Sequence, residues 1–238
     1  TRLAIASVGT GKDLVRTLGT RKPNQMLDAL DAGQCIAIDV GHLQFFEEGG
    51  APASRYFVNV ADMGLGADVA RRIESSPKGK AFGGMVSYLV QAVKTIRVFE
   101  ARPISVELEG RQVFEGMAQM VVFCNGQFFA GGMHVAPTSS LQDGLLDIFV
   151  LEQVSRRELL SSLLPRVYLG KHMGRKGVHH YQATCARIET PDPFLVELDG
   201  ELPGISPVTV EVVPGVLKVI AAPRDWALAD AAPRDPVR

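Results

Sequence analysis

The 238-residue sequence contains little cysteine and no excess of charge of either sign. Its three cysteines, Cys35, Cys124 and Cys185, are far apart in the chain and odd in number. That spacing matches no metal-ligand motif and predicts no disulfide framework, so we expect a reducing compartment. The 25 basic and 26 acidic side chains give a net charge of −1. This balance lacks the basic footprint of a nucleic-acid-binding protein, and we expect no nucleic-acid partner.

Long hydrophobic runs are also missing. The longest apolar stretches, such as residues 120–124, are much shorter than the roughly 20 residues that a membrane-spanning helix needs. No charged-then-apolar leader opens the chain. The sequence starts with Thr1 instead of Met, and residues 3–6 resemble the end of a strand. We therefore expect a cytoplasmic protein whose sequence begins inside a domain.

The residues that are abundant predict a mainly β protein. Hydrophobic residues make up 46% of the sequence, which is enough for a substantial core. Residues 1–33 combine a glycine-rich turn with two short helices, the second capped by Asn24 and stopped by Gly33. Beyond residue 34, apolar and polar residues alternate in short segments between Gly, Pro and Asp turns, which favours a β-sandwich over a parallel sheet. The expected strands are 36–40, 57–60, 104–108, 118–125, 145–151, 187–189, 194–198, 208–213 and 217–220.

Two longer helices interrupt the expected strands. Apolar residues recur at helical spacing between Lys80 and Phe99. Ser155 and Glu158 form a capping box at the start of the other helix, and Pro165, inside that helix or at its end, is expected to bend it. The predicted fold class is α+β, mainly β, with a C-terminal β-sandwich domain that contains inserted helices. The predicted boundaries divide the chain into residues 1–33, the β-sandwich domain 34–213, and a return strand and tail 214–238.

Four short segments carry polar residues beside glycine turns, and two of them lie in the first third of the chain. Residues 9–13, Gly-Thr-Gly-Lys-Asp, precede a helix, where free backbone N–H groups suit a phosphate. An ordinary strand-to-helix turn explains this segment equally well, and its glycine spacing is not that of a P-loop. In residues 59–69, two glycines permit close approach of a ligand to the backbone. Asp68 lies near the helix start there, where the helix dipole favours a carboxylate with or without a function.

The other two segments contain Asp-Gly pairs. Asp143, with backbone carbonyls nearby, could hold a hard cation such as Mg²⁺, although a turn leading into a strand is the commoner role. Asp199-Gly200 is a hairpin signal, and Glu201 follows it near a strand end. There Glu201 could accept a proton from a substrate hydroxyl during phosphoryl transfer, or it could be a solvated turn residue.

Residues 171–180 hold a mixed basic cluster. No two of its histidines stand at helical ligand spacing with a carboxylate partner, so a zinc site is not expected. The simpler interpretation of this cluster is a solvated polar loop. The more specific interpretation is a surface that attracts anionic lipid head groups.

In this order, the four segments resemble those of the bacterial diacylglycerol kinase and sphingosine kinase-like family. Residues 9–19 are similar to the family's Gly-Thr-Gly-Asn-Asp-Phe-Ala-Arg segment, and residues 57–69 to its next block. Residues 125–147 resemble the third block and residues 198–201 the fourth. Each block is short, but four of them in the right order with compatible spacing are a strong signal that covers nearly the whole chain.

The resemblance implies a fold and an activity. The family has an α/β nucleotide-binding domain similar to that of NAD kinases, of which residues 1–33 would be the remnant, and a β-sandwich that covers its cleft. ATP would donate its γ-phosphoryl group to the hydroxyl of a lipid such as diacylglycerol, with Mg²⁺ required. The partners implied are the lipid substrate and, transiently, a membrane surface, so we expect a protein peripheral to the membrane. Exposed strand edges leave a homodimer open.

The resemblance also implies roles for particular residues. Glu201 would be the general base, and Asp68 would contact the lipid head. A Mg²⁺ ion would be held by Asp143 and by the main-chain carbonyls of Ser140 and Leu145. The residues expected to bind the nucleotide are Gly9, Thr10, Gly11, Lys12 and Asp13.

Two departures from the family pattern affect these expectations. The family's Gly-Gly-Asp-Gly-Thr motif, which grips nucleotide phosphates, is expected before residue 1, so we expect weak or no ATP binding, and no activity, from this chain alone. Lys12 stands where the family usually has Asn, and an ammonium cannot reproduce the amide's paired donor and acceptor, although it could contact a phosphate. A non-catalytic lipid- or nucleotide-binding relative is therefore the alternative. A kinase acting on a non-lipid alcohol or on NAD is a third hypothesis.

Overall fold

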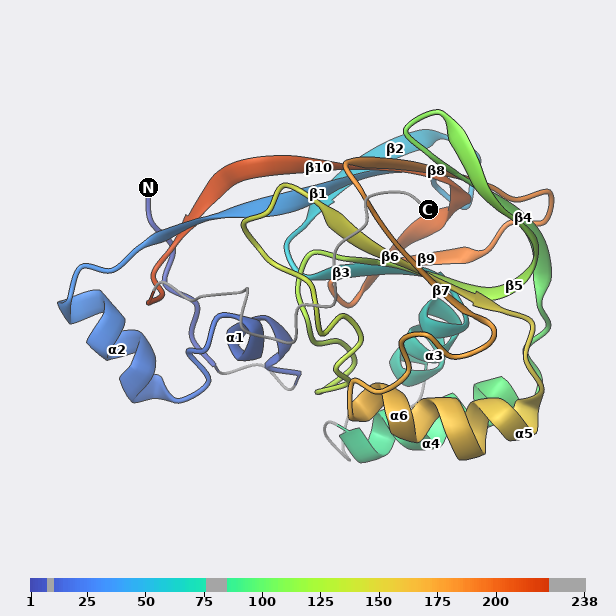
Figure 1. Cartoon of the computed structure of the whole chain (residues 1–238), viewed down its shortest axis with the longest axis horizontal. Helices are drawn as coiled ribbons and strands as arrows, with labels where there is room; N and C mark the ends of the chain where they lie inside the picture. Colours follow the sequence, from blue (N-terminus) through green and yellow to red (C-terminus); the bar gives the residue numbers. More distant parts are fainter. Residues whose placement is uncertain (8–10, 76–84, 223–238) are drawn as a thin grey trace.

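The computed structural model describes residues 1–7, 11–75 and 85–222, with only the backbone described for 85–88. The fold is mainly β, which confirms the predicted class, and its helices lie to one side of the strands (Figure 1). None of the helices in these ranges combines the length and the hydropathy of a membrane span.

The strands close into a barrel. Neighbours around the ring are antiparallel, and β9 pairs with both β3 and β10, which completes the circle. Because the ring is closed, each of its strands has a hydrogen-bonded neighbour on both sides and none is an edge strand. The ring contains β10 (Glu201–Val219), β8 (Cys185–Glu189), β4 (Arg102–Leu108), β5 (Arg111–Cys124), β3 (Val60–Gly64) and β9 (Leu195–Leu198).

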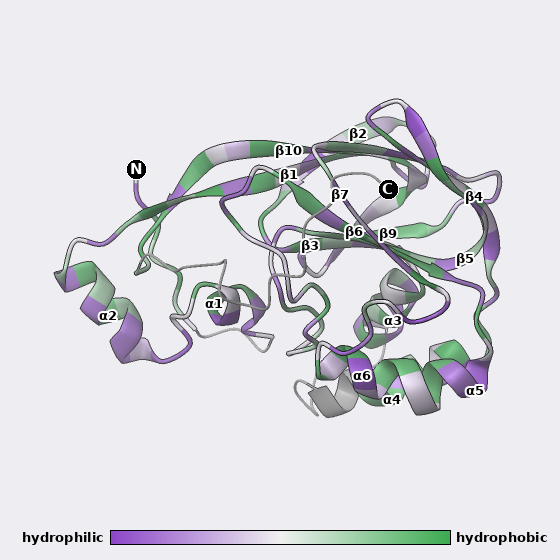
Figure 2. Cartoon of the chain, viewed as in Figure 1, coloured by the Kyte–Doolittle hydropathy of each residue, from purple (hydrophilic) through white to green (hydrophobic). Residues whose placement is uncertain are grey.

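Two pairs of strands extend the barrel. The hairpin of β1 (Ile36–Phe46) and β2 (Pro52–Phe57) continues outward from β10, and β6 (Leu146–Glu152) with β7 (Val178–Ala183) continues from β5. Figure 2 shows hydrophobic residues along β1 and β6 and on α4, while the β4–β5 turn and α5 are hydrophilic.

The two faces of the sheet bury different sets of side chains. In β5, Val121 and Phe123 point into the barrel and belong to the main core cluster, whereas Val122 and Cys124 belong to a second cluster on the opposite face. Successive residues of a strand point to opposite faces, so the alternation of β5 separates the two cores.

Helices cover the second face. They are α3 (Leu65–Glu74), α4 (Met85–Ile96) and a continuous segment made of α5 (Arg156–Glu158), η1 (Leu159–Leu163) and α6 (Leu164–Tyr168). The predicted cap of that segment is confirmed, because the Ser155 hydroxyl accepts a hydrogen bond of 3.2 Å from the Glu158 N–H. Pro165 has no N–H to donate, and a π-helical turn directly precedes it, so the helix continues past the proline.

The N-terminal residues form two short helices, α1 (Asp13–Thr17) and α2 (Pro23–Asp31), at the far end of the β1–β10 ribbon (Figure 1). The predicted cap of α2 at Asn24 is wrong. Lys22 is the cap residue and Pro23 occupies the first helical position, where its missing N–H costs nothing. The strand expected at residues 3–6 is reduced to a single bridge between Leu3 and Val219.

The expected strands differ from the observed ones in two further places. Residues 57–60 are not one strand, because β2 ends at Phe57 and β3 begins at Val60. The strands expected at 208–213 and 217–220 are parts of one strand, β10, so the boundary proposed between residues 213 and 214 lies inside it. β10 pairs with β1 on both sides of Pro214 and Gly215, with a register shift between Ile38 and Val40.

Candidate functional site

The first and third predicted blocks meet in space. Asp13 at the start of α1 accepts a hydrogen bond of 2.8 Å from the Gly131 N–H, and it also pairs with Arg16 at 3.3 Å. Gly132 has a φ of +115°, and a Cβ atom there would lie 1.9 Å from the Arg16 Nη1. Burial raises the pKa of Asp13, while the Gly131 N–H and Arg16 oppose the rise. Glycine at these positions thus permits the close contact that seats α1.

The second block joins the same assembly through its asparagine. The N–H groups of Asn125 and Gly126 donate to the Asn59 carbonyl at 3.0 and 2.8 Å. The Gln127 N–H donates to the Thr17 hydroxyl of α1 at 3.1 Å. Hydrogen bonds donated by backbone N–H groups therefore hold the third block against both the first and the second.

The fourth block is anchored by its aspartate. The Asp199 carboxylate accepts hydrogen bonds from the N–H groups of Val58, Asn59 and Val60 at 2.7, 3.0 and 3.0 Å. Its pKa is raised by burial, and these three N–H groups oppose the rise. Asp199 was predicted only as a hairpin residue, yet its side chain fixes the Asp-Gly-Glu turn to the loop before β3. Glu201 follows at the start of β10 and is exposed.

A buried pair of carboxyl groups lies beneath this turn. Asp62 of β3 stands directly opposite Glu197 of β9, and the two residues are 0% and 5% exposed. Glu197 accepts a hydrogen bond of 2.6 Å from the Gly200 N–H, and Asp62 accepts one of 2.9 Å from the Ala67 N–H. Neither residue was predicted as a site residue. Asp62 is the one charged residue in an otherwise apolar strand, and this interruption could have marked it as a candidate site residue from the sequence.

The predicted metal ligands lie in one loop before β6. The Asp143 Oδ1 accepts a hydrogen bond of 3.2 Å from the Leu145 N–H, and the Ser140 hydroxyl accepts one of the same length from the Gln142 N–H. Buried Asp39 fixes the loop from β1 by accepting from the Gly144 N–H at 2.8 Å. A carboxylate with main-chain oxygens is a donor set that fits Mg²⁺, with water completing the coordination. Within the described ranges, no three His, Cys, Asp or Glu side chains form a metal-binding group.

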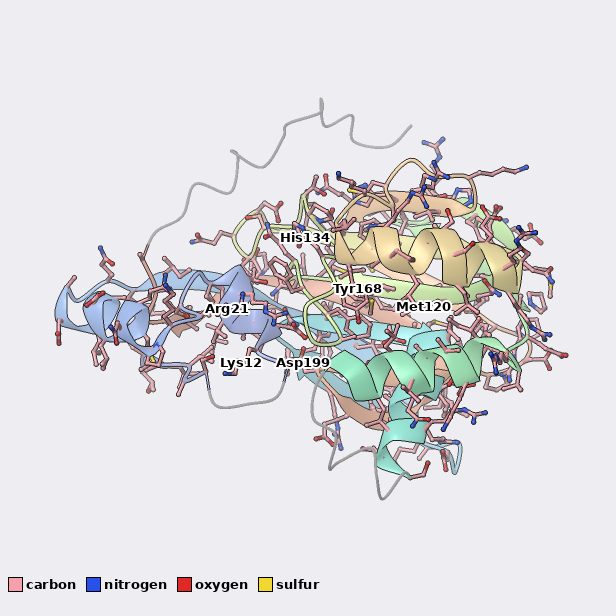
Figure 3. The ribbon with its side chains drawn as sticks, turned by 90° about the horizontal axis from the view of Figure 1, so that it is seen from below. Lys12, Arg21, Met120, His134, Tyr168 and Asp199 are labelled. Atoms are coloured by element: carbon pink, nitrogen blue, oxygen red, sulfur yellow. The ribbon has the colours of Figure 1, made fainter. Side chains whose placement is uncertain are left out.

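An apolar cavity of about 120 Å³ lies between the helices and the outer face of the sheet. Among the described residues that line it, His172 alone has a polar side chain. Figure 3 places Met120, which lines the cavity, between α4 and the α5–α6 segment. The cavity wall also includes Ile96, Val122, Phe129, Phe149 and Leu163.

One end of this cavity lies near the first block. Tyr168 ends α6, next to the lining residue Val167, and its pKa is raised by burial and by the charge of Asp13. His134 stacks on Phe128 with ring centroids 4.5 Å apart, and burial lowers its pKa. In Figure 3, Tyr168 and His134 lie at the end of the cavity helices that faces α1.

The other described residues that were predicted to bind the nucleotide or the lipid lie on different elements of the structure. Gly9 and Thr10 lie outside the described residues. Lys12 precedes α1 with a φ of +57° and is exposed. Asp68 of α3 is half-buried in a different depression, shared with Arg71 and Arg102, and it is not among the residues that line the apolar cavity. Its role at a lipid head stays a prediction.

The basic cluster at residues 171–180 is only partly the solvated loop that was expected, because residues 171–177 form a loop with exposed Lys and Arg side chains but the three histidines are buried or paired with carboxylates. His172 is buried against the cavity, and His179 and His180 belong to β7, where they pair with Glu152 at 3.2 Å and with Asp147 at 2.6 Å. Strand β7 was not predicted because its histidines are polar and do not show the apolar alternation of a strand. Their carboxylate partners, Glu152 and Asp147, belong to β6.

Comparison with known proteins agrees with this architecture. The family described as "YegS C-terminal NAD kinase beta sandwich-like domain" matches residues 59–221. A diacylglycerol kinase of Mycobacterium tuberculosis is 27% identical over 222 residues, covering 92% of this chain and 68% of the relative. A diacylglycerol kinase of Bacillus subtilis is 23% identical over 207 residues, covering 86% of this chain and 64% of the relative.

Solved structures give the same result. A crystal structure of a protein from Bacillus anthracis assigned as a diacylglycerol kinase aligns with a TM-score of 0.64 and 25% identity, over 90% of this chain and 66% of that one. The chain thus spans about two thirds of the length of the relatives it matches. The closed β-barrel with helices on its outer face falls within the region that these comparisons match. The chain belongs to the YegS C-terminal domain family, whose relatives here are named as kinases.

Proposed function

We propose that this chain forms the acceptor side of a lipid kinase, which transfers the γ-phosphoryl group of ATP to a hydroxyl of a lipid such as diacylglycerol. The observation that carries the proposal is the apolar cavity, because its lining includes Phe129 and Met133 of the third block, and the Gly131 N–H between them donates to Asp13 of the first block. Hydrocarbon suits such a cavity, whereas a sugar or a nucleotide would leave polar groups unpaired in it.

The size of the cavity is consistent with part of an acyl chain. An apolar cavity of about 150 Å³ in another protein stays dry and takes up benzene. The cavity of about 120 Å³ here is of similar size. Among the described residues, no backbone hydrogen bond joins α4 or the α5–α6 segment to the sheet, so these helices could adjust to a longer chain.

The chain's own residues suit the reaction in distinct ways. Glu201 follows a turn whose backbone is fixed, and it is exposed where an acceptor hydroxyl could approach, so it is the proposed general base. Gly11, Lys12 and Asp13 are proposed to face the nucleotide phosphates, and Asp68 the lipid head. The loop that carries Ser140, Asp143 and Leu145 would hold Mg²⁺, which supplies positive charge when bound and stabilises that loop.

The test uses the complete gene product that contains these residues, with ATP and a panel of lipids presented in mixed micelles. Glu201→Gln is expected to lower kcat by about 10²- to 10⁴-fold, the usual contribution of a general base, with an unchanged circular dichroism spectrum. Glu189→Gln, an exposed carboxylate on β8, is the matched control and is expected to keep wild-type turnover. Near-normal turnover in Glu201→Gln would contradict the assignment of the base. Lipid and ATP binding without turnover in the wild-type protein would favour the non-catalytic alternative.

A further inference from the structure

We propose that Asp62 and Glu197 share a single proton, and that this pair positions the Asp199–Glu201 turn for phosphoryl transfer. Glu197 is then a positioning residue that acts through Gly200, and Asp62 sets its charge state. The inference rests on the proposed function, since the turn matters to catalysis only if Glu201 is the base.

The geometry forces the two carboxyl groups together. Asp62 and Glu197 are cross-strand neighbours in antiparallel register, so their side chains leave the sheet on the same face. Both are buried, at 0% and 5% exposure, and the side chains are in hydrogen-bonding contact. Two buried carboxylates side by side cannot both ionise at low energetic cost. One proton between them removes the repulsion and supplies the hydrogen for their contact.

The hydrogen-bond pattern assigns that proton to Asp62. Its Oδ1 accepts from the Ala67 N–H, whereas its buried Oδ2 has no donor directed at it. A protonated Asp62 can donate instead, and the Glu197 carboxylate is the acceptor beside it. Burial raises the pKa of Asp62 well above its usual range, and the negative charge of Glu197 raises it further. Burial also raises the pKa of Glu197, but the bonds from Asp62 and Gly200 favour its ionised form.

The groups that face the pair from the surrounding elements keep the proton there. Asp68 of α3 acts on Asp62, while Asp13 of α1 and Asp199 of the turn act on Glu197, and all three are acidic. Burial raises the pKa of the Cys124 thiol of β5, and the charges of Asp147 and Asp62 raise it further, so the thiol is neutral. A second negative charge in the pair would therefore be opposed from every side.

The pair controls the turn through one backbone amide. Gly200 has a φ of +97°, and a Cβ atom there would meet no atom within 4 Å, so packing does not hold it. Its N–H is fixed by Glu197 at 2.6 Å, while Asp199 is fixed by the three N–H groups of residues 58–60. Glu201 is the next residue along the chain. Loss of the shared proton would separate the two carboxylates and release Gly200.

The first experiment measures kcat against pH in the complete gene product. Asp62→Asn replaces the shared proton with an amide hydrogen that no base removes, so the alkaline fall in kcat is expected to move to higher pH than in the wild-type protein. Asp192→Asn, an exposed loop residue, is the matched control and is expected to keep the wild-type profile. An Asp62→Asn profile that coincides with the wild-type profile would overturn the proposal.

The second experiment separates positioning from folding. Glu197→Leu removes the acceptor for Gly200 and is expected to lower kcat by about 10- to 100-fold per folded molecule, with little change in the lipid KM. Glu197→Gln keeps an acceptor oxygen and is expected to recover part of that loss. If Glu197→Leu lowers only the folded fraction, the residue is structural and the positioning role is wrong.

A spectroscopic measurement that does not depend on turnover tests the shared proton separately from the proposed kinase activity. Infrared difference spectra of the wild-type protein and Asp62→Asn are expected to show a protonated-carboxyl band at neutral pH that the variant lacks. Presence of that band together with normal turnover in Glu201→Gln would retain the shared proton and reject the base. Absence of the band would reject the shared proton whatever the kinetics of Glu201→Gln.

Discussion

The two faces of the same sheet are built differently. The inner face of the barrel is filled by apolar side chains such as Phe123 and Ile188, which are 1% and 0% exposed. The outer face, under α3, α4 and α5–α6, holds a cavity and the buried carboxyl pair. Hydrogen bonds fix the strands in a closed ring, so the interior of the barrel has a fixed volume that side chains fill. The helices contact the sheet through side chains, so a cavity can remain between helices and sheet. The difference suggests a division in which the inner face provides stability and the outer face holds the candidate functional site.

The largest expected effect tests the inner face. Phe123→Ala removes a fully buried ring from a barrel that cannot collapse, so it is expected to lower the free energy of unfolding by about 3–5 kcal/mol. Val122→Ala, on the outer face of the same strand, is expected to cost about 1.6 kcal/mol, the transfer term for the two carbons removed. Urea unfolding monitored by circular dichroism measures both. Equal losses would contradict the distinction between the faces.

The next effect tests the contact that seats α1 beside the cavity. Gly132→Ala places a methyl group against Arg16 at a positive φ, and it is expected to cost about 1–3 kcal/mol. Gly110→Ala is the matched control, since its φ of +82° is also positive but its surroundings are open. A larger loss in Gly132→Ala than in Gly110→Ala, measured by thermal unfolding, would show the cost of the displaced contact beyond backbone strain.

The cavity itself can be tested by filling it. Val122→Phe adds a ring on the outer face and is expected to raise the KM for long-chain lipids about tenfold, equivalent to roughly 1.4 kcal/mol, with a smaller effect on short-chain lipids. Met117→Phe, at an exposed position of the same strand, is the control. An unchanged KM for every chain length in Val122→Phe would exclude the cavity as the acyl site.

The smallest expected effect is on the pH dependence of stability. The pKa of Asp62 is raised in the folded state, so folding takes up a proton, and the stabilisation is complete below the ordinary pKa of 3.8. It is lost as pH rises from there through the raised pKa, with a slope of at most about 1.4 kcal/mol per pH unit for one proton. Asp62→Asn is expected to flatten this slope in urea titrations at several pH values. A slope unchanged by the substitution would assign the dependence to other groups.

Much of the fold followed from local patterns in the sequence. Alternation predicted most strands of the mainly β domain, and Ser155 with Glu158 predicted a helix start that the structure confirms. The four loop blocks indicated the family through their order and spacing, which are properties of the chain itself. Each of these features depends on neighbouring residues or on position along the chain, which is why the sequence alone determined them.

The tertiary structure decided the rest. Closure of the barrel depends on β9 pairing with both β3 and β10, which no local pattern specifies. The cavity depends on how far the helices stand from the sheet. Asp62 and Glu197 are 135 residues apart in the sequence, and only the antiparallel register places them opposite each other. Asp199 looked like a turn residue because its three N–H partners lie about 140 residues away. Contacts between distant segments set the charge state and the geometry of the site, and such contacts arise only when the chain has folded.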